Sequence, residues 1–167
     1  MLKKIILPVL VSLTFISCNC QKKTQTDAQG NLIMPKTSDK IVNSTYPTEK
    51  PEKNIVRLAE CQNVFLKEQQ MNVTFNKTLD DSRCPMNARC VWAGNASVEI
   101  ELMTTTSRPK KFKISVGELR DGLVQTINFG GYKVTLENLY PSNSTQMPFN
   151  KLKGKYVIDL KVEKSTN

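Results

Sequence analysis

Two cysteines that could carry redox or metal chemistry lie in one short stretch, DSRCPMNARCVWAG, at residues 81–94. Cys84 and Cys90 flank Met86, so the stretch offers sulfur ligands to a soft metal such as Cu(I). Thiol–disulfide enzymes instead place a C-x-x-C pair at the start of a helix. The wider spacing favours a structural Cys84–Cys90 disulfide. A thiol-redox or copper-handling protein is the less favoured alternative, and we expect no metal and no cofactor.

Histidine is absent from the sequence. This removes the commonest general base and the commonest metal ligand. Two carboxylate pairs remain, Asp80 with Asp81 and Glu99 with Glu101, and their positions are typical of a strand end and of a solvated strand face. The sequence contains no P-loop, EF-hand or serine-hydrolase pattern. We therefore predict that the protein is not an enzyme.

The N-terminal residues predict export. Two lysines precede an apolar run over residues 5–17, which is shorter than the roughly 20 residues of a membrane span and typical of a secretory signal. An uncleaved anchor is the alternative. The sequence FISC, residues 15–18, resembles the lipobox of bacterial lipoproteins, whose cysteine is lipidated and becomes the mature N-terminus. The resemblance implies a lipoprotein signal peptide over residues 1–17 and acylation of Cys18. The acyl chains would then hold the protein at a membrane of the cell envelope, the outer membrane in preference to the inner.

The remaining chain divides into two parts. Residues 18–54 are rich in Lys, Thr, Asn and Ser, contain three prolines and show no apolar period, so we predict a disordered tether. Residues 55–167 have the length of a single domain.

An alternation of apolar and polar residues predicts the fold of that domain. In NASVEIELM, residues 95–103, every second side chain is apolar, as in a strand with one buried face. Gly130-Gly131 predicts a two-residue hairpin turn. No long stretch shows a helical period, although residues 117–122 can hold one helical turn. The pattern indicates an antiparallel β-sandwich of about seven strands, with a small β-barrel as the alternative. The expected strands are 63–68, 72–79, 95–103, 112–116, 123–129, 132–136 and 155–163.

The cysteine-containing stretch connects two of these strands. We expect the Asp81 carboxylate to accept backbone N–H bonds from the turn and to pair with Arg83 or Arg89. Gly94 permits a bulge or a close backbone approach. Trp92 is predicted to cover the core beside the loop. On this interpretation the stretch is chiefly a structural clamp.

The same stretch also carries a resemblance. DSRCP, a short spacer and CVWAG leading into an alternating strand resemble a recurrent domain of bacterial secreted proteins and lipoproteins, most of them uncharacterised. The resemblance covers residues 60–163 and includes Tyr140-Pro141 and Tyr156, whereas Cys61 departs from it. It implies a β-rich envelope domain and no particular activity. Cys20 and Cys61 are either free or paired with each other.

The net charge of +9 is spread over the chain. We expect no nucleic-acid partner, and we expect an envelope protein or an anionic envelope polymer instead. The leading hypothesis is a non-catalytic binding or structural domain. The alternative is an inhibitor or accessory subunit that inserts the loop at residues 82–90 into a partner. An exposed, ordered loop would favour that alternative, and inward-facing Met86 and Arg89 would count against it.

Overall fold

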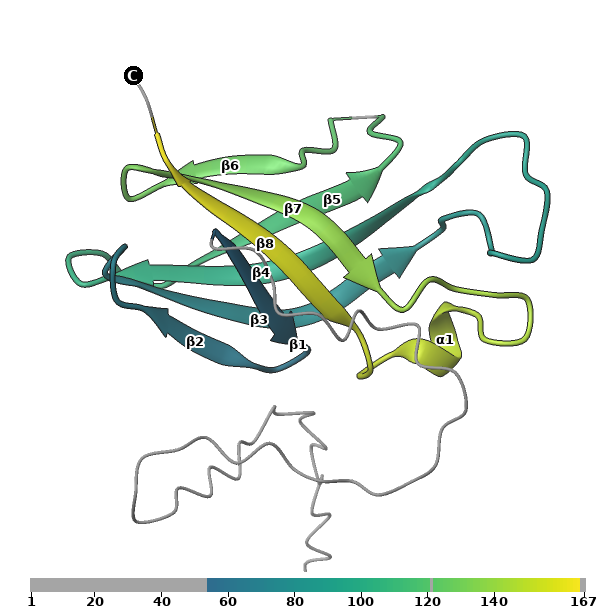
Figure 1. The fold of residues 1–167 in the computed structure, drawn as a ribbon, viewed down its shortest axis with the longest axis horizontal. Coiled ribbons are helices and arrows are strands. Elements are labelled where there is room, and N and C mark those ends of the chain that lie inside the picture. Colours follow the sequence, from purple (N-terminus) through teal and green to yellow (C-terminus); the bar gives the residue numbers. More distant parts are fainter. Residues whose placement is uncertain (1–53, 121, 166–167) are drawn as a thin grey trace, which may run out of the picture. The chain divides into compact units, whose positions relative to one another are not determined.

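The computed structural model describes residues 54–120 and 122–165, which form two antiparallel sheets packed face to face (Figure 1). One sheet has the order β1-β8-β7-β6 and the other β2-β3-β4-β5. In this part of the chain the predicted sandwich is confirmed, and the sheets do not close into a barrel. The elements are β1 (Ile55–Ala59), β2 (Asn63–Leu66), β3 (Met71–Asp81), β4 (Asn95–Thr104), β5 (Lys110–Gly117), β6 (Thr126–Phe129), β7 (Tyr132–Tyr140), α1 (Phe149–Leu152) and β8 (Val157–Lys164).

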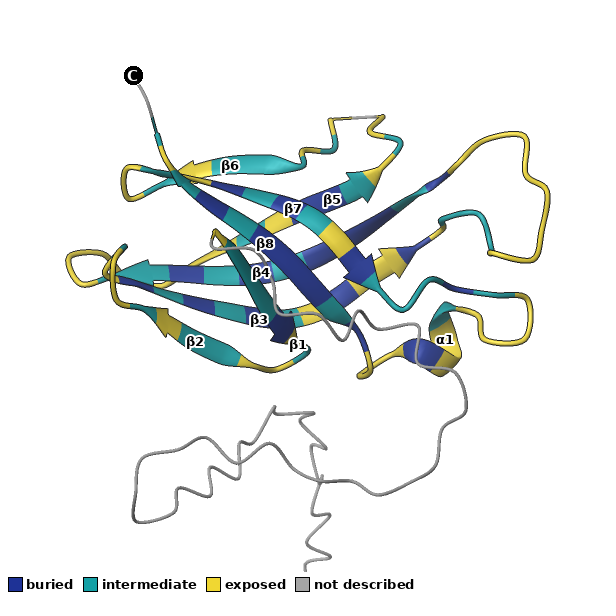
Figure 2. Cartoon of the chain, in the orientation of Figure 1, coloured by how far each residue is buried: buried dark blue, intermediate teal, exposed yellow. Residues whose placement is uncertain are grey.

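The core lies between the sheets and follows the alternation in the sequence. In β4, the side chains of Ala96, Val98, Ile100 and Leu102 are fully buried, while Glu99 and Glu101 face outward. The buried residues of both sheets belong to one hydrophobic cluster, and Figure 2 shows them along the strands of each sheet. The core members contributed by the other strands include Leu58, Met71, Val73, Phe75, Ile114, Val134, Leu136, Ile158, Leu160 and Val162.

The predicted hairpin turn is present in the structure, whereas the helix lies elsewhere than the sequence suggested. Gly130 and Gly131 both have positive φ, +59° and +81°, and join β6 to β7 as the predicted hairpin. The described residues of 117–122 form no helix. Gly117 belongs to β5 and the N–H of Glu118 donates to the carbonyl of Gly94, while a single turn closes from the N–H of Leu123 to the carbonyl of Arg120. The single helix of the described residues lies at Phe149–Leu152.

Three connections gather at one end of the sandwich, which we call the loop end (Figure 1). They are the β3–β4 loop at residues 82–94, the β5–β6 connection after Gly117, and the β7–α1 loop at residues 141–148. Strand β1 runs toward the loop end, because its last residue, Ala59, pairs with the first residue of β8. The predicted signal peptide and tether lie outside the described residues. Within the described part, no helix is long and apolar enough to cross a membrane.

Candidate binding site at the loop end

A buried ion pair begins the β3–β4 loop. Asp81 is the last residue of β3, and its carboxylate is fully buried. Arg83 donates from Nε to Oδ1 and from Nη2 to Oδ2 of Asp81, both at 2.8 Å. The same guanidinium donates to the carbonyls of Leu139 and Pro141, at 2.7 and 3.0 Å. Of the two arginines predicted as partners of Asp81, Arg83 forms the ion pair and Arg89 does not. Arg83 also connects the loop to the end of β7.

Tyr156 completes the surroundings of this carboxylate. It is fully buried just before β8, and its hydroxyl donates to Oδ2 of Asp81 at 3.0 Å. Burial raises the pKa of Tyr156, and so do the charge of Asp81 and the hydrogen bond to it. The backbone N–H of Arg83 also donates to Oδ1 of Asp81, at 3.3 Å, as the turn prediction required.

Asn143 in the β7–α1 loop is a site residue that the sequence reasoning missed. Its side-chain amide donates to the carbonyl of Arg83 at 3.1 Å, and its own carbonyl accepts from the N–H of Met86 at 3.1 Å. Two further hydrogen bonds join the loops, from Asn87 Nδ2 to Thr145 Oγ1 and from the Thr145 N–H to Asn87 Oδ1. In the sequence, PSNST at residues 141–145 indicates only a turn. The role of Asn143 could not be read from it, because the groups that Asn143 contacts lie about 60 residues away in the sequence.

The disulfide prediction is confirmed. Cys84 and Cys90 are bonded, with their Cα atoms 5.9 Å apart. Between them a turn closes through a hydrogen bond from the N–H of Ala88 to the carbonyl of Pro85. Cys61 is disulfide-bonded as well. Cys18 and Cys20 lie outside the described residues.

Gly94 closes the loop in the predicted way. It has φ +72°, and a Cβ at this position would overlap the carbonyl of Ser82. The N–H of Ser82 in turn donates to the carbonyl of Asn95 at 2.8 Å. A close backbone approach therefore needs glycine at residue 94.

The prediction that Trp92 covers the core is wrong. Its side chain is 46% exposed, and it is not a member of the buried core. The guanidinium of Arg120 lies over its ring, 5.4 Å from the centroid. The chain reaches the sheet only at Asn95, so Trp92 remains in the exposed part of the loop and packs on the β5–β6 connection instead of between the sheets.

The loop end exposes apolar side chains, and Figure 2 shows most of the β3–β4 loop coloured as exposed. Met86 is 67% exposed and Val91 is completely exposed, both on the β3–β4 loop that also carries Trp92. The neighbouring connections contribute Leu119 and Met147, each about two-fifths exposed. Arg89 is also exposed, so neither Met86 nor Arg89 turns inward.

The carboxylates considered as candidate catalytic groups are either paired with neighbouring side chains or exposed to solvent. Asp81 is held by Arg83 and Tyr156, while Asp80 is exposed. Glu99 accepts from Asn76 and pairs with Lys111 at 3.5 Å on the outer sheet face. The described residues contain no group of three or more Cys, Asp or Glu side chains placed to hold a metal ion.

Comparison with known proteins adds no relative: no family model matches the chain, and neither a curated protein nor a solved structure matches it.

Proposed function

We propose that this chain is a lipid-anchored protein of the cell envelope whose sandwich binds a partner protein through the loop end and catalyses no reaction. The observation that carries the proposal is the exposure of Met86, Val91 and Trp92 on a loop that is held in place. Exposed apolar side chains that occur together indicate an interaction site more often than scattered ones do. Trp, Met and Arg are also enriched at protein–protein interfaces.

The loop is suited to binding because little conformational freedom remains to be lost. The disulfide, the Asp81–Arg83 pair and the contacts to the β7–α1 loop fix its base. Binding by a preorganised loop avoids much of the entropy cost of ordering an interface. This favours the alternative raised from the sequence, an accessory subunit or inhibitor that presents this loop, over a purely structural domain.

Site-specific photo-crosslinking in intact cells tests the proposal. A photoreactive amino acid at residue 91 is expected to give a defined protein adduct, and Met86→Asp is expected to abolish it. Residue 65 provides the control, because Phe65 is 47% exposed, close to the 46% of Trp92, but lies on β2 away from the loop end. The proposal fails if residue 91 gives no protein adduct, or the same adducts as residue 65.

The membrane attachment is proposed from the lipobox resemblance alone. Cys18→Ala is expected to abolish incorporation of labelled palmitate and to leave the precursor unprocessed. Normal maturation of this variant would contradict the lipoprotein assignment while leaving the loop-end proposal intact.

A further inference from the structure

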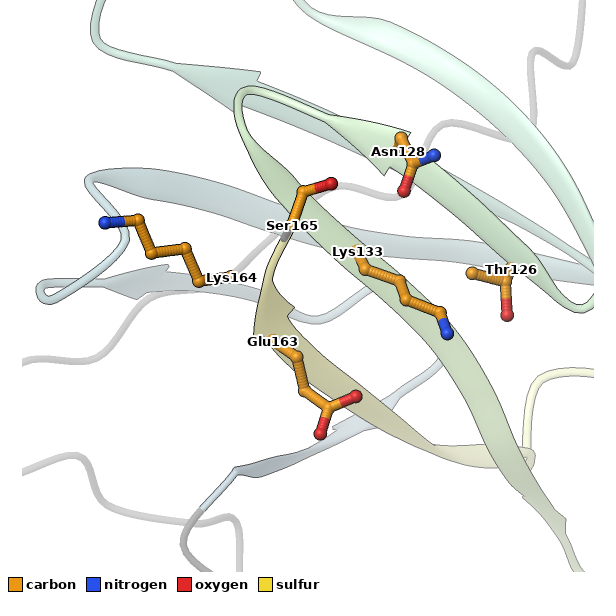
Figure 3. A pocket seen from close by; sticks show the side chains of 6 residues that line it. All are labelled: Thr126, Asn128, Lys133, Glu163, Lys164 and Ser165. Atoms are coloured by element: carbon orange, nitrogen blue, oxygen red, sulfur yellow. The ribbon is translucent and has the colours of Figure 1, made fainter. Parts of the chain in front are cut away.

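A polar groove lies on the outer face of the sheet that contains β6, β7 and β8, away from the loop end. It occupies about 510 Å³ and is lined by side chains of β6, β7 and the end of β8. Figure 3 shows the six lining residues, Thr126, Asn128, Lys133, Glu163, Lys164 and Ser165. Nothing in the loop-end site uses these residues.

The strand register builds the floor of this groove. Asn128 is opposite Lys133 in the β6–β7 pair, and Lys133 is opposite Glu163 in the β7–β8 pair. The three side chains therefore form a row across three strands, and neighbouring strands in a sheet are about 4.8 Å apart. The row is fixed at both sides, by a hydrogen bond between Thr126 and Thr135 and by one from the N–H of Ser165 to the carbonyl of Gly131.

The groove contains cationic groups without acidic partners. Within the described residues, the ion pairs of this sheet join Arg57 to Asp159 and Lys161 to Glu163. Lys133 and Lys164 take part in none of them. In Figure 3 the amino group of Lys133 points across the groove toward Thr126, whereas Lys164 extends away from the other side chains. Lys133 is thus the main positive charge of the groove, and Lys164 adds to the local potential.

The mixture of donors and acceptors indicates the class of ligand. Lys133, Asn128, Thr126 and Ser165 can donate hydrogen bonds to an anionic group. The carboxylate of Glu163 can only accept hydrogen bonds, and its Oε1 lies 2.9 Å from Nζ of Lys161. A bare phosphate would be repelled by this carboxylate. A sugar that carries both hydroxyl groups and an anionic group would satisfy both kinds of partner.

We propose that the groove formed by Asn128, Lys133, Glu163 and Ser165 binds an anionic carbohydrate, with Lys133 on the carboxylate or phosphate and Glu163 on a hydroxyl. Such a ligand is the repeating unit of an acidic polysaccharide or a phosphorylated sugar. The site is independent of the loop end, so either can fail without the other.

Binding measurements on the purified full-length protein in detergent test this proposal. The probes are an oligogalacturonate, a hexose phosphate, inorganic phosphate and an uncharged maltooligosaccharide, each measured by calorimetry. The variant Lys133→Gln/Lys164→Gln removes the unpaired cations. Its matched control is Lys111→Gln/Lys113→Gln, which removes the same charge from exposed positions on the outer face of β5.

One or both of the anionic sugars are expected to bind, and the probe that binds identifies the anionic group. The groove variant is expected to weaken that binding roughly tenfold or more, as the loss of charged hydrogen bonds requires, while the control retains it. Glu163→Ala is expected to weaken sugar binding too. The proposal is overturned if no anionic sugar binds, if phosphate or the uncharged sugar binds equally well, or if both double variants lose binding equally.

Discussion

The hydroxyl of Tyr156 donates a 3.0 Å hydrogen bond to Oδ2 of Asp81, although the two residues are 75 positions apart. This bond connects the start of β8 in one sheet to the end of β3 in the other. Because Arg83 binds both oxygens of the same carboxylate, one buried group joins two sheets and the cysteine loop. The loop-end surface therefore depends on an interaction that lies beneath it.

Tyr156→Phe is expected to change how stability depends on alkaline pH. The folded state raises the pKa of Tyr156, chiefly through burial, whereas an unfolded tyrosine has a pKa of about 10. Above pH 10 the unfolded state therefore releases this proton first, and stability falls as the pH rises. Below that pH the contribution is fully present. The wild type is expected to lose unfolding free energy more steeply than Tyr156→Phe above this pH.

Chemical denaturation from neutral pH to about pH 11 checks this expectation. At neutral pH, Tyr156→Phe should be less stable by about 1.5–3 kcal/mol, because a hydrogen bond to a charged acceptor is lost. Tyr132→Phe is the control, since the described residues give its hydroxyl no hydrogen bond. Parallel alkaline slopes for the wild type and Tyr156→Phe would contradict the role given to Tyr156.

Asp81→Asn should destabilise the protein by about 3 kcal/mol, because it leaves the mostly buried guanidinium of Arg83 without its counter-ion. Asp80→Asn provides a matched control at the next residue. Asp80 is exposed, so its substitution should change stability by no more than about 0.5 kcal/mol. Urea denaturation of both variants measures the difference. Equal stabilities would mean that the ion pair does not hold the loop.

The sequence predicted most of the strands and the disulfide of the β3–β4 loop correctly. It did not predict which residues far away in the sequence contact that loop. Alternation placed the inward side chains of β4, and the spacing of Cys84 and Cys90 predicted their bond. Asn143 could not be found this way, because it acts on backbone groups of a loop distant in sequence. Trp92 was misplaced for a related reason: a large aromatic residue just before a strand fits both a core and an exposed loop, and only the path of the chain decides.

The double variant Cys84→Ser/Cys90→Ser is expected to stay folded and to lose about 2 kcal/mol of stability, because the bridge closes a short loop. The hydrogen bonds of Asn143 and Asn87 to the neighbouring loop remain, so the core should be unaffected. Amide hydrogen exchange should quicken at residues 85–93 and stay unchanged in β4. Global loss of protection would show that the bridge does more than fix the loop.

The cysteine inventory leads to a second prediction about disulfides. The sequence has five cysteines, of which Cys84 and Cys90 bond to each other and Cys61 is disulfide-bonded. If Cys18 is acylated as proposed, Cys20 is the remaining partner for Cys61. Peptide mapping without reduction is expected to recover a Cys20–Cys61 pair and no alkylatable thiol in the mature protein. A free thiol at Cys20 would argue against this pairing.

Trp92→Ala separates a structural role from a binding role. The side chain is 46% exposed and contacts Arg120, a cation–π pair worth about 0.5–1 kcal/mol at an exposed site. Its removal should therefore cost no more than about 1 kcal/mol, whereas Phe75→Ala in the core should cost about 3–5 kcal/mol. Trp92→Ala should nonetheless weaken the crosslink formed from residue 91, because exposed aromatic anchors dominate interface energy. Denaturation and crosslinking are measured on the same preparations. A stability loss as large as that of Phe75→Ala, together with an unchanged crosslink, would make Trp92 part of the clamp and not of the binding surface.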